Sequence, residues 1–301
     1  FFALSIAIMI AGTISLGMYK LNLGIDFSSG TRIDVAANTE LSVEKVQDDL
    51  NALKVKDEKI VLSPDKKQAT VHSKESFAQE KSIEIKEYFA KKYEKEANLS
   101  VVSPVIGKEL AKNALFALLY ASIGIIIYVA FRFEWRMGLT SVIALLHDVC
   151  IIIFLASLLR LEIDITFIAA VLTIVGYSIN DTIVTFDRIR EHMRHEKVLT
   201  SKEQIYKVVD VSLRQTLTRS INTVLTVIIT VIVMLLIGSS SIYSFNVALL
   251  IGLIFGLYSS LFIAAQLWAV LKVRELNKKG KIAVSVRQSP KERKENDKVL
   301  V

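Results

Sequence analysis

Apolar residues along this chain gather into six long runs, which cover residues 1–19, 110–131, 137–159, 165–186, 218–238 and 242–271. Each run is close to the ~20 residues with which an α-helix crosses the ~30 Å hydrocarbon core of a bilayer. The joints after the second, third and fifth runs are only a few residues long, as in helical hairpins. The pattern therefore predicts an α-helical polytopic membrane protein with six transmembrane helices.

A long polar segment, residues 24–108, separates the first apolar run from the second. Alternating or clustered apolar residues predict strands at 31–36, 59–62, 68–72 and 99–102. Apolar residues at helical spacing predict one helix that starts at Ser42 and another over residues 76–93. This β-α-β-β-α-β order predicts a small ferredoxin-like α+β domain.

Lys and Arg residues are concentrated in alternate joints between the runs. Residues 188–219 contain eight of them and the segment from Lys272 onward contains ten, whereas the joint at 160–164 has only Arg160. Because cytoplasmic loops carry the excess of Lys and Arg, we expect residues 188–219 and the segment from Lys272 onward to be cytoplasmic. An even number of spans then places both termini in the cytoplasm and residues 24–108 outside it.

The predicted domains follow from these patterns. Residues 1–23 form the first transmembrane helix, whose natural start we expect to be missing because Phe1 already lies in an apolar run. Residues 24–108 form the extracytoplasmic domain, and residues 109–271 form helices two to six with a cytoplasmic amphipathic loop at 188–217. Residues 272–301 form a basic tail with too few large apolar residues to fold on its own.

Two patterns within the 188–217 loop predict a helix. Thr200 and Glu203 have the spacing of a capping box. Ile205, Val208 and Leu213 then recur on one helical face, which is typical of an amphipathic helix lying in the membrane interface.

The composition excludes several classes of protein. The chain is 52% hydrophobic with a mean hydropathy of +0.45, which is too apolar for an ordinary soluble domain. The net charge of +7 is explained by membrane topology, so no nucleic-acid partner is expected. Cys150 is the only cysteine, and neither a metal-binding cluster nor a nucleophile–base set is apparent. We therefore expect neither an enzyme nor a cofactor.

Two charged residues lie deep in the predicted membrane segment. Asp181 follows Asp164 by 17 residues and Arg219 precedes Gly238 by 19. At a helical rise of ~1.5 Å per residue they lie about 25 Å and about 28 Å from the outer boundary. An unpaired charge at the centre of a bilayer helix costs roughly 2.5–3.5 kcal/mol on insertion scales. An Asp181–Arg219 pair is therefore predicted, although Arg219 could instead extend its head group to the interface.

A second acidic residue, Asp148, falls near the middle of the third run, beside His147. A carboxyl group at that depth is either paired or protonated, so it could carry protons. His147 could equally be a hydrogen-bonded packing residue. Three polar residues close to Asp181 in sequence or on the next span are candidates to support such a site by hydrogen bonding: Tyr177, Asn180 and Asn222.

Several of these segments together resemble one known family. Residues 176–182 (Gly-Tyr-Ser-Ile-Asn-Asp-Thr) and 186–191 (Phe-Asp-Arg-Ile-Arg-Glu) resemble the signature of SecF within the SecD/SecF family of protein-export membrane proteins. Further matching segments occur in order along nearly the whole chain, at residues 24–27, 132–136, 146–149, 215–219 and 258–260. One departure is Ser28-Ser29-Gly30, where the family usually has Thr-Gly-Gly.

The resemblance implies six helices in the arrangement of the RND superfamily. It implies a SecF subunit, or the SecF half of a fused SecDF, that uses the proton motive force to promote export across the bacterial cytoplasmic membrane. The proton-coupling residues would be Asp181 and Arg219. The implied partners are SecD, separate or fused, the SecYEG translocon, a YidC-type insertase, translocating precursors and membrane lipid.

Two other classes of function remain open at this point. One is a proton-coupled RND-type exporter of small molecules or lipids. The other is a membrane assembly or scaffold protein that transports nothing, for which Asp181 would be dispensable.

Overall fold

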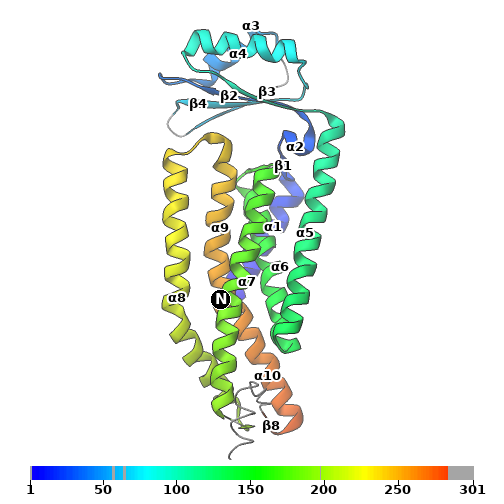
Figure 1. Cartoon of the computed structure of the whole chain (residues 1–301), viewed down its shortest axis with the longest axis vertical. Coiled ribbons are helices and arrows are strands. Elements are labelled where there is room, and N and C mark those ends of the chain that lie inside the picture. The colour runs from blue at the N-terminus through cyan, green and yellow to red at the C-terminus, as the bar shows by residue number, and fades with distance from the viewer. Residues whose placement is uncertain (1, 56–57, 64–65, 197, 284–301) are drawn as a thin grey trace, which may run out of the picture.

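The computed structural model describes residues 2–55, 58–63, 66–196 and 198–283. Long helices run side by side along the molecule, and a β-sheet domain lies across one end of them (Figure 1). The long helices are α1 (Phe2–Tyr19), α5 (Pro104–Arg132), α6 (Trp135–Leu158), α7 (Ile165–Glu196) and α8 (Lys202–Ile237). A last long helix combines α9 (Tyr243–Ser259), the π-helical turn η2 (Ser260–Ala264) and α10 (Ala265–Lys279).

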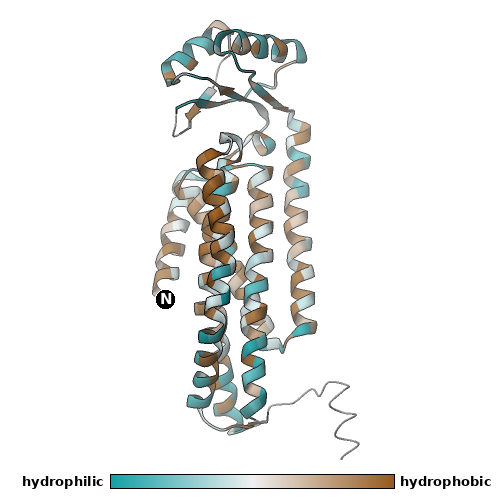
Figure 2. Ribbon diagram, turned by 60° about the vertical axis from the view of Figure 1, so that its left-hand side comes forward, coloured by the Kyte–Doolittle hydropathy of each residue, from teal (hydrophilic) through white to brown (hydrophobic). Residues whose placement is uncertain are grey.

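Five of these helices are long and apolar enough to cross a membrane: α5, α6, α7, α8 and the combined helix Tyr243–Lys279. The first predicted run forms α1, whose apolar part, Ala3–Tyr19, is shorter. The helices are apolar over most of their length and become polar at the end away from the sheet (Figure 2). The chain is thus a multi-pass membrane protein, and its polar residues mark both ends of the apolar band.

The N-termini of two long helices, α5 and α8, are capped by serine side chains. Ser103 is the N-cap of α5, where its Oγ accepts a hydrogen bond from the Ile106 amide at 3.4 Å, and Pro104 occupies the first turn. The capping box of α8 is formed by Ser201 and Gln204, one residue later than the predicted Thr200–Glu203 pair. The shift arises because the Gln204 side chain accepts from both the Thr200 and the Ser201 amides, at 2.8 and 3.2 Å.

The segment predicted as a cytoplasmic amphipathic loop, residues 188–217, is divided between two long helices, and the helix expected within it is the first part of α8. Residues 188–196 end α7, and α8 runs unbroken from Lys202 to Ile237, because no Gly or Pro interrupts that sequence. Ile205 and Val208 are buried in the same core cluster as Trp268 of α10. The apolar face therefore packs against protein in this chain.

The sheet domain contains β2 (Gly30–Ala36), α3 (Val43–Ala52), β3 (Glu58–Leu62), β4 (Gln68–Ser73), α4 (Gln79–Tyr93) and β5 (Asn98–Val102). The strands form an antiparallel sheet in the order β3-β4-β2-β5. One face carries Ile33 and Val71, which pack with Leu50 and Phe89 of the two helices in a buried core. Because side chains alternate along a strand, polar neighbours such as His72 lie on the opposite face, toward the membrane helices.

Short elements connect the sheet domain to the membrane part. β1 (Asn22–Leu23) pairs in parallel with β6 (Glu162–Ile163), between α6 and α7, and α2 (Ile25–Ser28) follows β1. The Asp26 carboxylate accepts a hydrogen bond from the Ile165 amide at 2.9 Å. A 3₁₀ turn, η1 (Ser240–Ile242), joins α8 to α9, and β7 (Val198–Leu199) pairs with β8 (Ile282–Ala283) at the other end. The sequence patterns predicted none of these pairings.

The predicted disorder of the basic tail concerns residues 272–301. Of these, α10 extends to Lys279 and β8 covers Ile282–Ala283. Residues 284–301, like Phe1 at the other end, lie outside the described residues.

Candidate functional site

Asp181 lies on α7 where three spans meet. Its carboxylate accepts hydrogen bonds from the Ser220 hydroxyl of α8 and the Ser260 hydroxyl of the π-helical turn, one on each oxygen. The residue is half-buried. A change in its charge would therefore act on the contacts of α7 with both neighbours.

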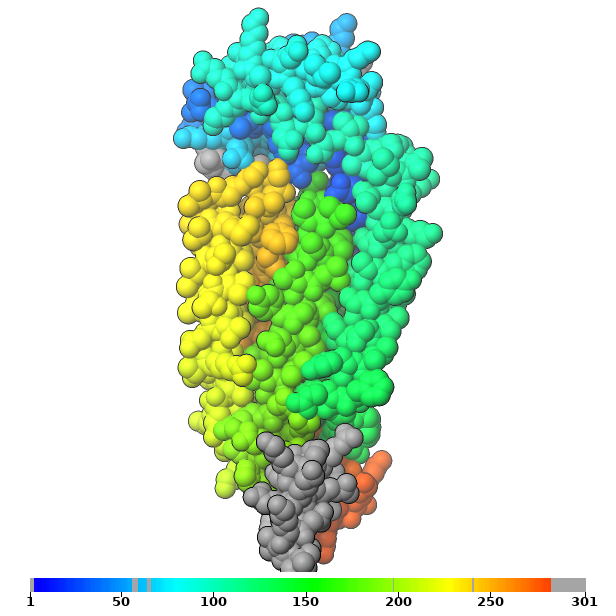
Figure 3. Space-filling view, viewed as in Figure 1, coloured from blue at the N-terminus to red at the C-terminus, as the bar shows by residue number. Residues whose placement is uncertain are grey.

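A small cavity of about 100 Å³ opens beside Asp181, between α7, α8 and α9. Its polar lining includes Tyr177, Ser178, Asn180, Asp181, Arg219 and Thr223. A volume of this size and polarity holds several water molecules. Figure 3 shows α7 in green at the surface between α8 in yellow and α5 in blue-green.

Arg219 lines the same cavity as Asp181, but its side chain is exposed. Within the described part of the chain no ion pair or hydrogen bond joins it to Asp181. The two residues predicted to pair are thus brought to one cavity without touching, and serine hydroxyls take the direct positions on the carboxylate. Asn222, also exposed on α8, does not line this cavity.

Asp148 of α6 is completely buried, with no exposed surface. Its Oδ2 accepts hydrogen bonds from Ser178 of α7 at 2.6 Å and from Ser259 of α9 at 2.7 Å. Its Oδ1 lies 3.1 Å from Nδ1 of His147, whose Nε2 has no partner in the described chain. Asp148 thus joins three spans through hydroxyl groups, and Ser178 connects it to the cavity beside Asp181.

Glycine allows α9 to approach α7 closely at this site. A Cβ atom at Gly252 would lie 2.4 Å from Cγ1 of Ile174, and one at Gly256 would lie 3.4 Å from Cβ of Ser178. The π-helical turn begins directly after, at Ser260. Sequence analysis gave Ser259 and Ser260 no role beyond the family resemblance at residues 258–260, so it missed the two hydroxyls that reach the carboxylates.

Ion pairs fix the polar ends of the spans on the side away from the sheet. Asp187 of α7 accepts from Arg132 at 2.7 Å and from Arg190 at 2.9 Å. Glu275 of α10 lies 3.0 Å from Arg136. These residues hold the joint between α5 and α6 against α7 and α10, which is a structural role.

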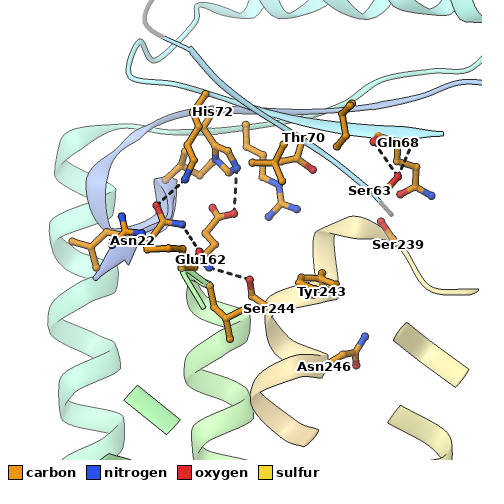
Figure 4. A pocket seen from close by; sticks show the side chains of 18 of the residues that line it. Asn22, Ser63, Gln68, Thr70, His72, Glu162, Ser239, Tyr243, Ser244 and Asn246 are labelled. Carbon is orange, nitrogen blue, oxygen red and sulfur yellow. Dashed lines mark hydrogen bonds and ion pairs between the residues drawn. The ribbon is translucent and has the colours of Figure 1, made fainter. Parts of the chain in front are cut away.

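A second and larger cavity, about 1220 Å³, lies between the sheet and the helix ends (Figure 4). Across it, Nε2 of His72 on β4 lies 3.2 Å from the Glu162 carboxylate of β6. Arg32 and Asp164 lie 3.8 Å apart, and the Ser241 hydroxyl donates to Asp34 at 2.7 Å. These polar contacts hold the sheet domain on the membrane part.

Burial changes the titration of the pair that crosses this cavity. It raises the pKa of Glu162 to about 7, with Asp164 and Asp34 adding to the rise and Arg32 opposing it. Burial and the nearby Arg32 charge lower the pKa of His72 to about 4. At neutral pH the imidazole is therefore uncharged and the carboxyl close to half protonated, so the contact is a hydrogen bond more than an ion pair.

These observations define a multi-pass membrane protein with two carboxyl groups hydrogen-bonded inside its helix bundle and a sheet domain at one end. A family model described as "Protein export membrane protein SecD/SecF, C-terminal" matches residues 82–274. The SecD/SecF GG motif matches residues 14–40. The chain belongs to the SecD/SecF family.

Named relatives and solved structures agree with this assignment. The chain is 51% identical over 279 residues to the protein translocase subunit SecDF of Bacillus subtilis, covering 92% of this chain and 38% of that protein. It is 38% identical over 284 residues to the protein translocase subunit SecF of Alicyclobacillus acidocaldarius, covering 92% of both. The crystal structure of the translocon-associated membrane protein SecDF from Thermus thermophilus matches with a TM-score of 0.78 and 33% identity, over 91% of this chain and 37% of that one. The chain thus spans less than two-fifths of the SecDF proteins but nearly all of the SecF protein.

Proposed function

We propose that this chain acts as a SecF subunit, or as the SecF half of a SecDF protein, that uses the proton motive force to promote protein export. Its family and its relatives, which are named protein translocase subunits, support a role in the Sec pathway. The observation that carries the proton coupling is the half-buried Asp181 carboxylate, hydrogen-bonded to two other spans beside a polar cavity. Carboxyl groups that face a polar cavity inside a membrane bundle are typical of the proton relays of pumps and transporters.

The proposed architecture has six spans, with α1 as the first, and a ferredoxin-like domain over residues 24–108 outside the membrane. The strand order β3-β4-β2-β5 with two helices on one face supports the ferredoxin-like assignment. The excess of Lys and Arg at residues 188–219 and in the tail supports cytoplasmic termini in the bacterial cytoplasmic membrane. The domain boundaries are those predicted from the sequence, at residues 23, 108 and 271.

The proposed partners follow from the same family relation. SecD, separate or fused, would pack against the membrane helices, and the complex would work with SecYEG, a YidC-type insertase and translocating precursors. The chain itself would perform no enzymatic reaction and need no cofactor.

In the proposed mechanism, proton uptake by Asp181 changes the contacts of α7. The charged carboxylate attracts the hydroxyls of Ser220 and Ser260 and the Arg219 guanidinium across the cavity. The protonated form loses that attraction, so a different packing of α7 against α8 and α9 becomes favoured. The rearrangement would reach the outer domain through α1 and α5.

The test compares gradient-dependent export for wild type and Asp181→Asn in the complex with SecD. Asn keeps the shape and hydrogen bonding but cannot titrate, so we expect normal assembly and loss of stimulation by the gradient. Arg219→Lys keeps the charge but not the planar guanidinium, so a partial defect is expected. Asn222→Ala, on α8 but away from the cavity, is the matched control and should behave as wild type.

The measurement is translocation of a precursor into inverted membrane vesicles, with and without a proton gradient. Equal stimulation by the gradient in wild type and Asp181→Asn would exclude Asp181 from the mechanism and favour a scaffold role.

A further inference from the structure

Two adjacent serines connect the two carboxyl groups of the helix bundle. Ser259 donates to Asp148 of α6, and Ser260 donates to Asp181 of α7. The π-helical turn begins at Ser260 and extends to Ala264. Such turns are rare in proteins, and those that occur are often found at functional sites. Neighbouring residues of one helix therefore contact both acids at the point where its hydrogen-bond pattern changes.

Each of these serines has one hydroxyl proton and two possible acceptors. Besides Asp148, the Ser259 Oγ lies 3.1 Å from the carbonyl oxygen of Gly256. Besides Asp181, the Ser260 Oγ lies 3.0 Å from the carbonyl oxygen of Leu257. A hydroxyl group has a single hydrogen to donate, so each serine donates to only one of its two acceptors at a time.

The charge of the carboxyl group determines whether the serine donates to the carboxyl group or to the backbone carbonyl. A charged carboxylate forms the stronger bond, so the serine proton points to it. Once the carboxylate takes up a proton, its own O–H donates to the serine oxygen, and the serine proton turns to the backbone carbonyl. The protonation of each acid is thereby transmitted to the backbone of α9 just before the π-helical turn.

The surroundings of Asp148 suit a group that gains and loses a proton. No Lys or Arg forms an ion pair with it in the described part of the chain. The titratable groups that face it are His147 on its own helix and, beyond that ring at 6.3 Å, Tyr258 of α9, whose hydroxyl accepts from Ser5 of α1. A permanently charged carboxylate without a cation is costly in such a buried position.

A route from the cavity beside Asp181 to Asp148 is also present. Ser178 lines the cavity and donates to the Asp148 carboxylate at 2.6 Å. A proton from cavity water can join the Ser178 oxygen while the original hydroxyl proton passes to Asp148. The serine ends the step neutral, and the carboxylate ends it as a carboxylic acid.

We propose that Asp148 is a second proton-carrying residue, and that Ser259 and Ser260 couple its protonation to that of Asp181 through the π-helical turn. The proposal rests on the proposed function, because it requires that Asp181 carries protons.

The first measurement is infrared difference spectroscopy of the complex with SecD in lipid vesicles, between acidic and alkaline pH. We expect the carbonyl band of protonated carboxylic acid to contain one component that is lost in Asp148→Asn and another that is lost in Asp181→Asn. Asp148→Glu retains a carboxyl group and should retain a component at a shifted pH midpoint. Ser141→Ala, on α6 two turns before Asp148, removes a hydroxyl that donates to Met137 and should leave the spectrum unchanged.

The second measurement is gradient-dependent export in inverted vesicles. Asp148→Asn should lose stimulation by the gradient. Ser259→Ala should reduce it and Ser259→Thr, which keeps the hydroxyl, should restore it. Likewise, Ser260→Ala should reduce the stimulation and Ser260→Thr should restore it, because the proposal requires both serines for coupling.

The outcomes separate the two proposals. If Asp181→Asn loses stimulation while Asp148→Asn keeps both stimulation and the full carboxylic acid band, the role of Asp148 is refuted and the proposed function stands. If Asp181→Asn keeps stimulation, the proposed function itself fails. If Asp148→Asn does not assemble with SecD, the spectrum of Asp148→Glu decides, and a midpoint identical to wild type refutes the proposal.

Discussion

The contact between α7 and α9 near the site can be tested by adding one methyl group. Gly252 of α9 faces Ile174 of α7, and a Cβ atom there would lie 2.4 Å from Cγ1, 2.5 Å from Cδ1 and 2.7 Å from Cγ2. Carbon atoms in contact are normally about 3.5–4.0 Å apart, so the overlap is about 1 Å. Rotation of the Ile174 side chain does not relieve it, because atoms on both branches are too close. We therefore predict that Gly252→Ala forces the two helices apart.

The expected size of the effect follows from two opposing terms. Overpacking of a tight interior costs about 1–3 kcal/mol, and Ala is more favourable than Gly within a helix by up to about 1 kcal/mol. The net loss for Gly252→Ala is therefore about 0–2 kcal/mol, toward the upper end because the overlap is about 1 Å. Gly256→Ala is the matched control one turn away, because its Cβ would lie 3.4 Å from Ser178 Cβ, an ordinary contact. It should be neutral or slightly stabilising.

The assay is thermal unfolding of the purified complex in mild detergent, with gradient-dependent export measured in parallel. Gly252→Ala should lower the midpoint and Gly256→Ala should not. In an Ile174→Ala background all three crowded atoms are gone, so Gly252→Ala should no longer destabilise. Equal shifts for the two glycine variants, or an unchanged loss in the Ile174→Ala background, would refute the packing argument.

Two further predictions concern the sheet domain. The pKa of Glu162 is raised from 4.5 to about 7, so Glu162 stabilises the docked sheet domain at low pH and this contribution is lost as the pH rises from 4.5 to 7. The pKa of His72 is lowered from 6.5 to about 4, so His72 destabilises the docked domain as the pH falls below 6.5. Glu162→Gln should remove the loss between pH 4.5 and 7 and leave only the effect of His72, so spin labels at Lys86 and Ser239 should report docking that strengthens from pH 4 to 6.5 and is constant above it; a wild-type pH response would contradict this. Ser29 has φ 64° and ψ 164°, a conformation that favours glycine, so Ser29→Gly should stabilise the chain by about 1 kcal/mol in thermal unfolding, and a destabilised variant would disprove the strain.

Much of the sheet domain could be predicted because its signals are local. Alternation and helical spacing gave the order of its strands and helices, with ends within a few residues of those found. The largest difference is the start of α4, predicted at Ser76 and found at Gln79. The Ser76 hydroxyl donates to the Val102 carbonyl and the Phe77 amide donates to Thr31, so contacts with distant strands hold these residues out of the helix.

The site could be predicted only in part, because depth along a helix says nothing of direction around it. Equal depth suggested that Asp181 and Arg219 meet, and they do line one cavity, but Arg219 is turned outward and Ser220 contacts the acid instead. Asn222 was chosen by proximity in sequence and does not line the cavity. The two-residue pairing of β1 with β6 and the π-helical turn have no periodic signal of their own.

The joint between the sheet and α5 has a mechanical consequence. Strand β5 ends at Val102 and α5 begins at Pro104, so a single residue, Ser103, separates the sheet from a 29-residue helix. A helix of that length is roughly 44 Å long and acts as a lever arm. A tilt of the helix by about 5° about its far end would displace the strand by about 4 Å. The single connecting residue is too short to compensate for this displacement, so the strand would move with the helix. Inserting a few glycines after Ser103 would uncouple the two ends while leaving each one folded.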